Sequence, residues 1–504
     1  MSIDQPNILL ITSDQQHWSA LGAINDRIKT PALDRLAAEG TRFDRAYCPS
    51  PVCSPSRSSI ITGQYPSQHG CWTIGVKLDE AIPTVGDYLQ QQGYDTTLIG
   101  KAHFQPLAST EDQMSLEAMP TLRDLDFWRG FHGPWYGFNH VEVARMHGDE
   151  HLVGQHYAAW MEEQGFGSWK SHFNAWPLDP GAPVREHAWD LPEEFHYTTW
   201  TGERTIANIE RAVGENHPFF IWSSFHDPHP PYVVPEPWAS MYDPDDMEPG
   251  TLTPGELDVL PRHFRLTQEE SPDYSAWQET EFGNHGFRSH LVDESQLRKD
   301  MAIYYGMVSF MDYQIGRILD SMADLGIADN TIVVFTTDHG HFLGQHGLFH
   351  KGAFHFEDLL RLPFLVRAPG KVPAGVVNSA LQSLVDLAPT FLTAAGLPVP
   401  GAMQGISQWE SWQGGAPARE WAMVENRHQP TKLSLRTLVM DRYKITVYRG
   451  SDDGELFDLQ ADPGEVRNLW ADPDFADVKA AMLLRFVQAE IEKEPMRYPR
   501  IAGA

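Results

Sequence analysis

Asn7-Ile8-Leu9-Leu10-Ile11 is the first of four short apolar runs that decide the fold. The other three are Thr96-Thr97-Leu98-Ile99, Phe219-Phe220-Ile221-Trp222 and Thr331-Ile332-Val333-Val334-Phe335. A run that is apolar at nearly every position is typical of a parallel strand buried on both faces, whereas a half-exposed strand alternates. Helical patterns lie between the runs, for example over residues 84–92 and 298–325. This order predicts an α/β fold with a doubly wound, mostly parallel sheet flanked by helices.

Polar, mostly titratable side chains follow each of these runs. They lie in the segments Ser13-Asp14-Gln15, Gly100-Lys101-Ala102-His103, His226-Asp227-Pro228-His229 and Asp338-His339. In open α/β sheets, ligands bind in the crevice beyond the carboxyl ends of the strands. We therefore expect an active site at this edge of the sheet.

Two further segments extend the predicted sheet. Residues 105–200 have weak periodicity and many tryptophans, and we interpret them as an insertion over the active-site edge. Simple aromatic packing of long loops explains this composition equally well. Short strand patterns between residues 422 and 459, followed by a helical pattern, predict a small antiparallel sheet with a terminal helix. We therefore expect a catalytic domain over 1–415 and a smaller α+β subdomain over 416–504.

The composition excludes several classes of partner. The 504-residue chain has a formal net charge of −30, which argues against binding to nucleic acids or anionic membranes. The amino terminus shows no signal peptide and no membrane span, so we expect a cytoplasmic protein. Three cysteines do not form a disulfide framework, and we expect Cys48 and Cys71 to be buried and inert.

Asp14, Asp338 and His339 are candidate metal ligands, because they follow two different strands that end at the same edge. Carboxylates with one imidazole suit Ca²⁺, Mg²⁺ or Mn²⁺ better than a structural zinc ion. Either aspartate alone could instead cap a helix. The combination of both loops favours the metal site.

Basic and imidazole side chains are expected around this ion. They are Arg57, Lys101, His103, His229 and Lys351. With a divalent ion and two aspartates, the formal charge of the site is about +3, inside a strongly acidic protein. Such a site suits a tetrahedral oxyanion, whose developing charge these donors would stabilise.

Cys53-Ser54-Pro55-Ser56-Arg57, followed by Thr62-Gly63, resembles the sulfatase signature, in which Cys-x-Pro-Ser-Arg directs oxidation of the cysteine to formylglycine (3-oxoalanine). Other family motifs are matched in order at residues 6–14, 100–103, 228–229, 337–340, 347–351, 455–459, 462–465 and 468–469. The sequence is identified as a member of the sulfatase family. The resemblance implies an alkaline-phosphatase-like fold.

The resemblance also implies a metal site and a covalent mechanism. Asp14, Asp338, His339 and the modified Cys53 would bind one divalent ion, Ca²⁺ or Mn²⁺ in preference to Mg²⁺, with Gln15 as a further carbonyl ligand. One hydroxyl of the formylglycine hydrate would attack sulfur. The sulfate ester would then break when the second hydroxyl loses its proton and the aldehyde reforms.

Five side chains receive catalytic roles from the same resemblance. Arg57 would hold the hydrate, Lys101 would bridge it towards the metal, and His103 would be the base that collapses the intermediate. His229 and Lys351 would contact the sulfate and protonate or stabilise the leaving oxygen. The implied partners are a small-molecule sulfate ester and, transiently, the formylglycine-generating enzyme. We also expect a homodimer or a higher homo-oligomer, since symmetric dimers are the commonest assembly.

Two positions depart from the common sulfatase pattern. Many sulfatases have a second aspartate at the position of Gln15 and an asparagine at the position of His339. The present combination resembles phosphonate monoester hydrolases and choline-sulfatase-like members, so phosphonate monoester or phosphodiester hydrolysis is the main alternative. Lys101 and His103 favour sulfate, because the phosphonate enzymes have neutral hydroxyl residues there. We therefore expect a sulfuric ester hydrolase of the arylsulfatase type with promiscuous activity on phosphonates and phosphodiesters. A non-catalytic protein that binds sulfated ligands is a further alternative.

Overall fold

The computed structural model describes residues 5–145, 150–173, 188–278, 283–429, 432–498 and 500–503. Residues 146–149 and 174–187 of the predicted insertion lie outside these ranges. The statements below refer to the described residues.

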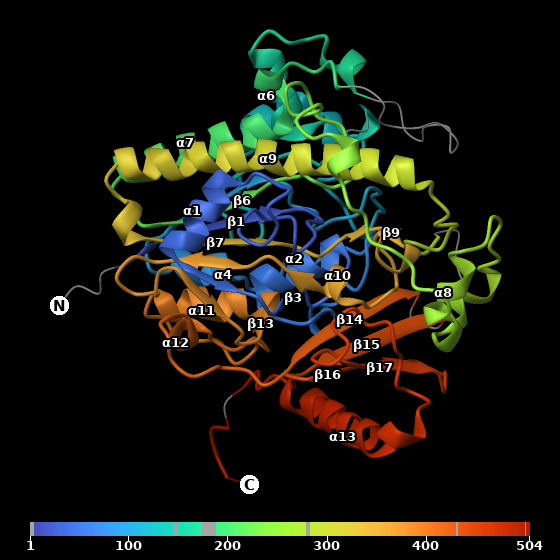
Figure 1. Ribbon diagram of the computed structural model, residues 1–504. Coiled ribbons are helices and arrows are strands. Elements are labelled where there is room, and N and C mark those ends of the chain that lie inside the picture. The colour runs from blue at the N-terminus through green and yellow to red at the C-terminus, as the bar shows by residue number, and fades with distance from the viewer. Residues whose placement is uncertain are drawn as a thin grey trace.

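An eight-stranded sheet forms the centre of the molecule, in the order β12-β2-β11-β7-β1-β6-β4-β5 (Figure 1). The four predicted runs correspond to four adjacent strands of this sheet, β1 (Asn7–Ser13), β4 (Asp95–Gly100), β6 (Phe219–Ser224) and β7 (Thr331–Thr337). The other strands are β2 (Thr41–Phe43), β5 (His140–Val143), β11 (Leu365–Arg367) and β12 (Val376–Asn378). β11 is antiparallel to both of its neighbours, and the remaining pairings are parallel.

Both faces of the sheet are covered, and β1 shows why. Because successive side chains of a strand point to opposite faces, Ile8 and Leu10 lie in one hydrophobic core, and Leu9 and Ile11 lie in the other. The first core packs against α2 (Cys53–Thr62), α4 (Val85–Gln90) and α11 (Leu387–Ala394). The second packs against α1 (Pro31–Glu39), α7 (Tyr197–Gly214) and α9 (Glu294–Asp324). In Figure 1, α7 and α9 lie above the sheet and α4 and α11 below it. The doubly wound prediction is confirmed.

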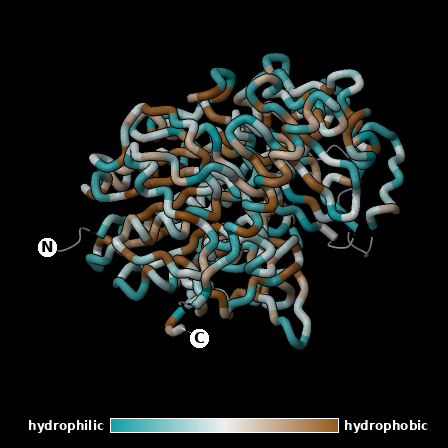
Figure 2. Tube along the Cα trace, turned by 90° about the horizontal axis from the view of Figure 1, so that it is seen from below, coloured by the Kyte–Doolittle hydropathy of each residue, from teal (hydrophilic) through white to brown (hydrophobic). Residues whose placement is uncertain are grey.

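Shorter elements complete the main layer. The helices are α3 (Pro66–His69), α8 (Arg262–Leu266), α10 (Glu357–Leu360) and α12 (Trp409–Trp412). The strands are β3 (Ala46–Tyr47), β8 (Phe342–Leu343), β9 (Phe349–His350), β10 (Arg361–Leu362) and β13 (Gln382–Ser383). Hydrophilic segments make up much of the outer trace (Figure 2).

The carboxyl-terminal part forms the predicted antiparallel sheet and terminal helix, drawn in orange and red in Figure 1. Its elements are β14 (Ala422–Gln429), β15 (Leu433–Val439), β16 (Tyr443–Tyr448), β17 (Gly454–Asp458) and α13 (Ala476–Glu492). Met423, Leu438 and Ile445 pack with Met482 and Phe486 of the helix in one hydrophobic cluster. The boundary between residues 415 and 416 stays a prediction.

The described part of residues 105–200 is more regular than expected. It supplies β5, the edge strand of the main sheet, together with α5 (Leu125–Gly130) and α6 (Gln155–Glu163). Tyr157, Trp169, Trp189 and Trp200 form a separate hydrophobic cluster. The interpretation of the range as an insertion over the active-site edge stays a prediction.

Helix length and composition also bear on membrane association. Within the described ranges, no helix is both long and apolar enough to span a bilayer.

We predict that alanine at Gly100 destabilises the fold more than alanine at Gly93, although both residues have positive φ (+92° and +82°). A Cβ at Gly100 would lie 2.0 Å from the carbonyl oxygen of Ser224, whereas a Cβ at Gly93 meets nothing within 4 Å. Left-handed backbone costs an alanine about 1–2 kcal/mol at both positions, so the difference between the variants isolates the steric clash. Urea unfolding should give a lower midpoint for Gly100→Ala than for Gly93→Ala. Equal midpoints would show that the strands do not approach this closely.

Candidate active site

Cys53 is the first residue of α2 and is fully buried. Its Sγ atom lies 3.1 Å from Nε2 of His339, 3.1 Å from Nζ of Lys351 and 3.7 Å from Oδ1 of Asp14. Asp14 follows β1, His339 follows β7 and Lys351 follows β9. The fold thus gathers three distant segments around the first turn of one helix.

The expected metal ligands form one compact group. Ligand atoms of Asp14, Cys53, Asp338 and His339 all lie within 4.8 Å of one another, and all four residues are buried. The Nδ1 atom of His339 lies 3.0 Å from the carbonyl oxygen of Gly340, which can only accept, so Nδ1 carries the proton in the neutral ring. The lone pair of Nε2 is therefore available to the cluster, as in metal-ligating histidines. Two carboxylates and one imidazole fit a divalent cation.

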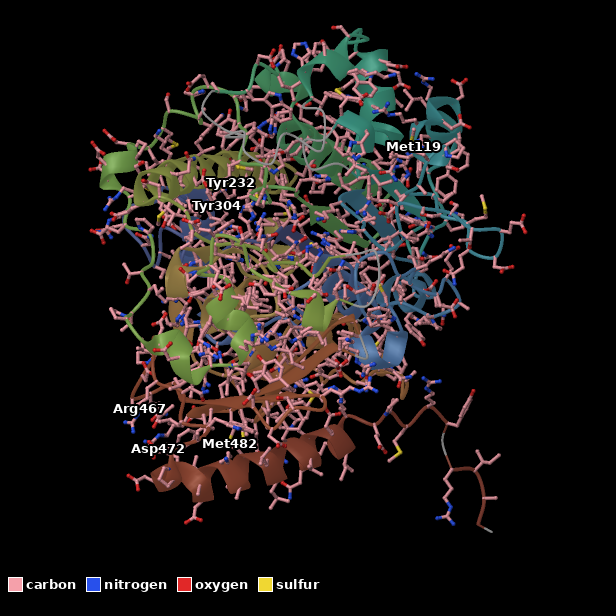
Figure 3. The ribbon with its side chains drawn as sticks, turned by 90° about the vertical axis from the view of Figure 1, so that its right-hand side faces the viewer. Met119, Tyr232, Tyr304, Arg467, Asp472 and Met482 are labelled. Carbon is pink, nitrogen blue, oxygen red and sulfur yellow. The ribbon has the colours of Figure 1, made fainter. Side chains whose placement is uncertain are left out.

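Gln15 is held beside this group in a left-handed backbone conformation, with φ of +62°. Its backbone N–H donates to Oδ1 of Asp338 at 3.0 Å, and its amide nitrogen lies 2.8 Å from Nδ1 of His341. His341 lies in turn 2.6 Å from the hydroxyl of Tyr232 and stacks on the ring of Tyr304. Figure 3 labels the two tyrosines next to each other. The amide oxygen of Gln15 is buried and, among the described residues, has no hydrogen-bond partner, which is compatible with the expected carbonyl ligand.

Two buried ion pairs hold the carboxylates. Nε of Arg57 donates to Oδ2 of Asp338 at 2.9 Å, and Nζ of Lys101 pairs with Oδ2 of Asp14. Nη1 of Arg57 donates to Oγ of Ser224 at 2.7 Å and to the carbonyl oxygen of Lys101 at 3.0 Å. Within the described ranges, Nη2 of Arg57 has no hydrogen-bond partner, although it is buried. Such a donor can form a hydrogen bond to a group that replaces the thiol, or to a bound oxyanion.

The cations dominate the electrostatics of the cluster. Burial by itself would raise the pKa of Asp14, but Lys101, Arg57 and Lys351 lower it below the usual value. Burial and Asp14 would also raise the pKa of Cys53, yet Lys101 and Lys351 bring it below the usual value. Anions are therefore stabilised here, in a protein of strongly negative net charge.

The two predicted catalytic histidines are kept neutral. Burial, followed by the positive charges of Arg145 and Lys101, lowers the pKa of His103 well below its usual value. Burial and Lys351 do the same for the pKa of His229. Nδ1 of His229 lies 2.6 Å from the carbonyl oxygen of Pro230, which leaves Nε2 to accept from Nζ of Lys351 at 3.3 Å. A neutral imidazole can act as a base or as an acceptor in a relay.

All ten predicted site residues lie at this edge of the sheet, and nine of them are buried. His229 is partly exposed. The side chains of Asp14, Cys53, Asp338, His339, Lys101, Arg57, Lys351 and His229 are linked by direct contacts. His103 is coupled electrostatically to Lys101, Arg57 and Lys351.

Three further polar residues at this edge were not predicted from the sequence. They are Ser224, Arg145 and Glu117. Ser224 ends β6 and accepts from Arg57, and the rule that found the other strand-end residues could have identified it. Arg145 follows β5, a strand of four residues with a weak signal in the sequence. Glu117 lies in a loop and has no pattern around it.

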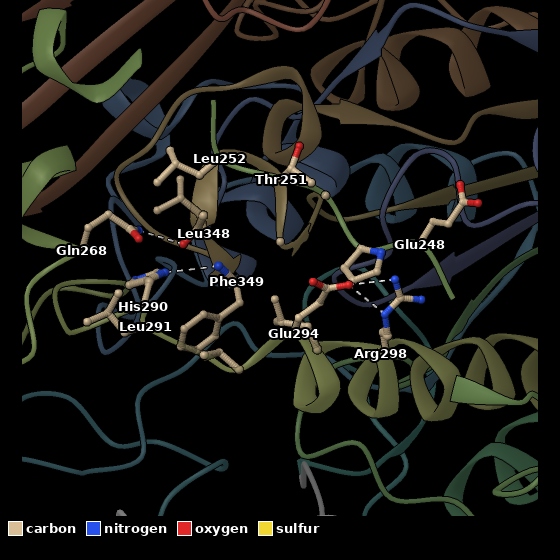
Figure 4. Close-up of a pocket in the computed structure, with 16 residues that line it drawn as sticks. Glu248, Thr251, Leu252, Gln268, His290, Leu291, Glu294, Arg298, Leu348 and Phe349 are labelled. Atoms are coloured by element: carbon tan, nitrogen blue, oxygen red, sulfur yellow. Dashed lines mark hydrogen bonds and ion pairs between the residues drawn. The ribbon is translucent and has the colours of Figure 1, made fainter. Parts of the chain in front are cut away.

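A pocket of about 530 Å³ lies beside β8 and β9 (Figure 4). Leu252, Leu291, Leu348 and Phe349 line its apolar part, and the ion pair of Glu294 with Arg298 lies at one side. None of the ten predicted site residues lines this pocket. The candidate reacting groups are those of the buried cluster, so this pocket is not the candidate active site.

Comparison with protein-family models matches residues 6–397 to the sulfatase domain and residues 344–492 to the C-terminal region of N-sulphoglucosamine sulphohydrolase. The chain is 28% identical over 475 residues to an arylsulfatase of Clostridium perfringens, with 92% of this chain and 90% of the relative covered. It is 28% identical over 502 residues to the multifunctional alkaline phosphatase superfamily protein PehA of Trinickia caryophylli, with coverage of 93% and 92%.

Among solved structures, the phosphonate monoester hydrolase of Agrobacterium radiobacter matches with a TM-score of 0.79 and 26% identity, over 99% of this chain and 98% of that chain. The sulfatase model covers most of the sequence and includes every residue of the cluster around Cys53. The chain therefore belongs to the sulfatase family of the alkaline phosphatase superfamily.

Proposed function

We propose that the protein hydrolyses sulfate monoesters, with aryl sulfates as the preferred class. The observation that carries this proposal is the buried group at Cys53, where a nucleophile position, two carboxylates, an imidazole and Lys351 converge within contact distance. Such a group places fixed positive charge where a tetrahedral oxyanion reacts. The sulfate ester hydrolases among its relatives support the same reaction class.

The residues present fit both the divalent metal ion and the formylglycine that the family implies. A divalent ion, Ca²⁺ or Mn²⁺ in preference to Mg²⁺, would be held by Asp14, Asp338, His339 and residue 53. The amide oxygen of Gln15, which has no hydrogen-bond partner among the described residues, would be an additional ligand. When present, the metal and formylglycine supply a hydroxyl nucleophile of lowered pKa at residue 53. Arg57 and Lys101 orient the carboxylates and offer donors beside that position.

Lys351 and His229 assist the departure of the leaving group. Nζ of Lys351 lies near both residue 53 and Nε2 of His229, so its protons can reach a sulfuryl oxygen or the ester oxygen. As the sulfur–oxygen bond to the alcohol breaks, the departing oxygen needs a proton or a positive charge, and this pair supplies it. Neutral His103 can take the proton whose loss releases sulfate from residue 53.

Hydrolysis of phosphonate monoesters or phosphodiesters is the second candidate. It is favoured by the Asp14-Gln15 and Asp338-His339 combination and by the similarity to the Agrobacterium enzyme. Lys101 and His103 favour sulfate, since both are charged or basic groups where the phosphonate enzymes have hydroxyls. The two substrate classes are monoanionic and tetrahedral, so we expect some activity on both.

We also propose a homo-oligomer and a transient complex with the formylglycine-generating enzyme. Leu484, Val487 and Ile491 of α13 support self-association, because they recur at helical spacing and are each more than half exposed.

We predict that residue 53 carries formylglycine when the protein is produced with the modifying enzyme. Mass spectrometry of the peptide containing this residue should show an aldehyde or its hydrate, whereas the peptides of Cys48 and Cys71 should keep free thiols. The latter two are internal controls, since burial raises the pKa of both thiols. Cys53→Ala should lower kcat by about 10³-fold or more. A free thiol at residue 53 in a fully active preparation would refute the mechanism.

We predict that kcat/KM for an aryl sulfate exceeds that for the matched aryl phosphonate monoester by about tenfold or more. The reason is that Lys101 provides fixed positive charge in the candidate site and neutral His103 provides a base. A panel of sulfate, phosphonate and phosphodiester substrates with one leaving group measures the order. The reverse order would assign the protein to the phosphonate branch.

A further inference from the structure

Arg145 lies at the active-site edge of the sheet, two residues beyond β5. β5 pairs in parallel with β4, and Gly100 is opposite Val143 in the register. The N–H of Ala144 donates to the carbonyl oxygen of Gly100 at 3.0 Å. Arg145 therefore follows the sheet edge next to the segment that carries Lys101 and His103.

A carboxylate fixes Arg145 in this place. Nε of Arg145 lies 3.2 Å from Oε2 of Glu117, and both side chains are buried. Oε1 of Glu117 accepts from the backbone N–H groups of Phe104 and Gln105, at 2.9 and 3.2 Å. Glu117 thus links Arg145 to the two residues that directly follow His103.

Two donors of this guanidinium, Nε and Nη1, lack a hydrogen bond to the described residues, and Nε is held only by the ion pair with Glu117. Arg145 is 4% exposed, and its Nη1 atom is buried without a hydrogen-bond partner in the part of the chain that the structure describes. Buried polar groups are nearly always hydrogen-bonded, and an unpaired one near a reacting centre points to a ligand that supplies the missing partner.

The electrostatic environment links Arg145 to the candidate site. After burial and Glu117, the charges that influence its pKa are those of Cys53, Arg57 and Asp14. Arg145 is also the charged residue with the largest influence on His103. A cation in this position attracts an anionic oxygen that approaches residue 53.

We infer that Arg145 is a substrate-binding residue, whose Nη1 donates to an anionic oxygen of the ester while Glu117 positions the guanidinium. This inference rests on the proposed hydrolysis of sulfate esters and adds a donor that the family motifs do not contain. The anionic oxygen belongs either to the reacting sulfuryl group or to a second anionic group on the alcohol half, such as a carboxylate. Both have the same hydrogen-bonding chemistry, and substrates can separate them.

The test compares wild type, Arg145→Gln, Arg145→Lys and Glu117→Gln with 4-nitrophenyl sulfate and its ring-carboxylated analogue. Inorganic sulfate serves as a competitive inhibitor. Arg123→Gln is the matched control, because Arg123 lies in the same range of the chain and its partners are Glu150 and Val153 rather than residues of the cluster. Arg145→Gln should lower kcat/KM about 10- to 100-fold, the usual size for a charged hydrogen bond. Arg145→Lys should recover part of it, and the control should stay within about twofold of wild type.

The pattern of losses identifies the oxygen. An equal loss on both substrates, with weaker inhibition by sulfate, assigns Arg145 to the sulfuryl group. A loss confined to the carboxylated substrate assigns it to the alcohol half.

Two results would overturn the inference. The first is unchanged kcat/KM on both substrates. The second is an equal loss reproduced by Glu117→Gln, with a lowered thermal midpoint and unchanged sulfate inhibition, which would show that Arg145 only supports the loop. If wild type hydrolyses phosphonates but no sulfates, the proposed function fails on its own, and the matched phosphonate pair then gives the same comparison for Arg145.

Discussion

The ion pair between Arg57 and Asp338, buried without solvent exposure, is the interaction on which the site depends. Placing such charges in the interior is costly unless each has a partner, and removing one partner of a buried pair costs about 3–5 kcal/mol. Arg57 and Lys101 meet this condition by pairing with the two carboxylates of the candidate metal cluster. The same pairs bring positive charge to the site, although the net charge of the protein is strongly negative. A chain with a net charge of −30 concentrates cations at one point, which favours the binding of an anion there.

The architecture makes this concentration possible. Strands β1, β4, β6 and β7 are adjacent in the sheet, so the residues that follow them meet at one edge. Helix α2 supplies the proposed nucleophile position and one of the site's cations together, because residues four apart lie on one face of a helix and Arg57 is four residues after Cys53. Lys351 directly follows β9, and the partly exposed His229 lies beside it. The candidate site is therefore assembled from segments that no local motif connects.

The sequence predicts most of this arrangement, for identifiable reasons. Continuous apolar runs specify the central strands, and polar residues after them specify the edge at which they meet. The resemblance to sulfatases assigns roles to these residues, and the structure brings them together, although the roles themselves stay proposals. Arg145 and Glu117 could not be predicted, because Arg145 follows a strand of only four residues and its partner Glu117 lies in an irregular loop. The imidazole protonation at His339 and His229 depends on single carbonyl contacts, which only a fold can supply.

The metal content of the protein tests the central claim most directly. It can be measured after chelation and reconstitution with Ca²⁺ or Mn²⁺, in wild type, Asp338→Asn and Asp386→Asn. Asp386 is a matched control, because it also forms a buried ion pair with an arginine, Arg419, outside the cluster. We expect about one ion per chain in wild type and in Asp386→Asn, and a strongly reduced content in Asp338→Asn. Equal metal content in wild type and Asp338→Asn, or an active wild type without metal, would contradict a metal centre built on Asp14, Asp338 and His339.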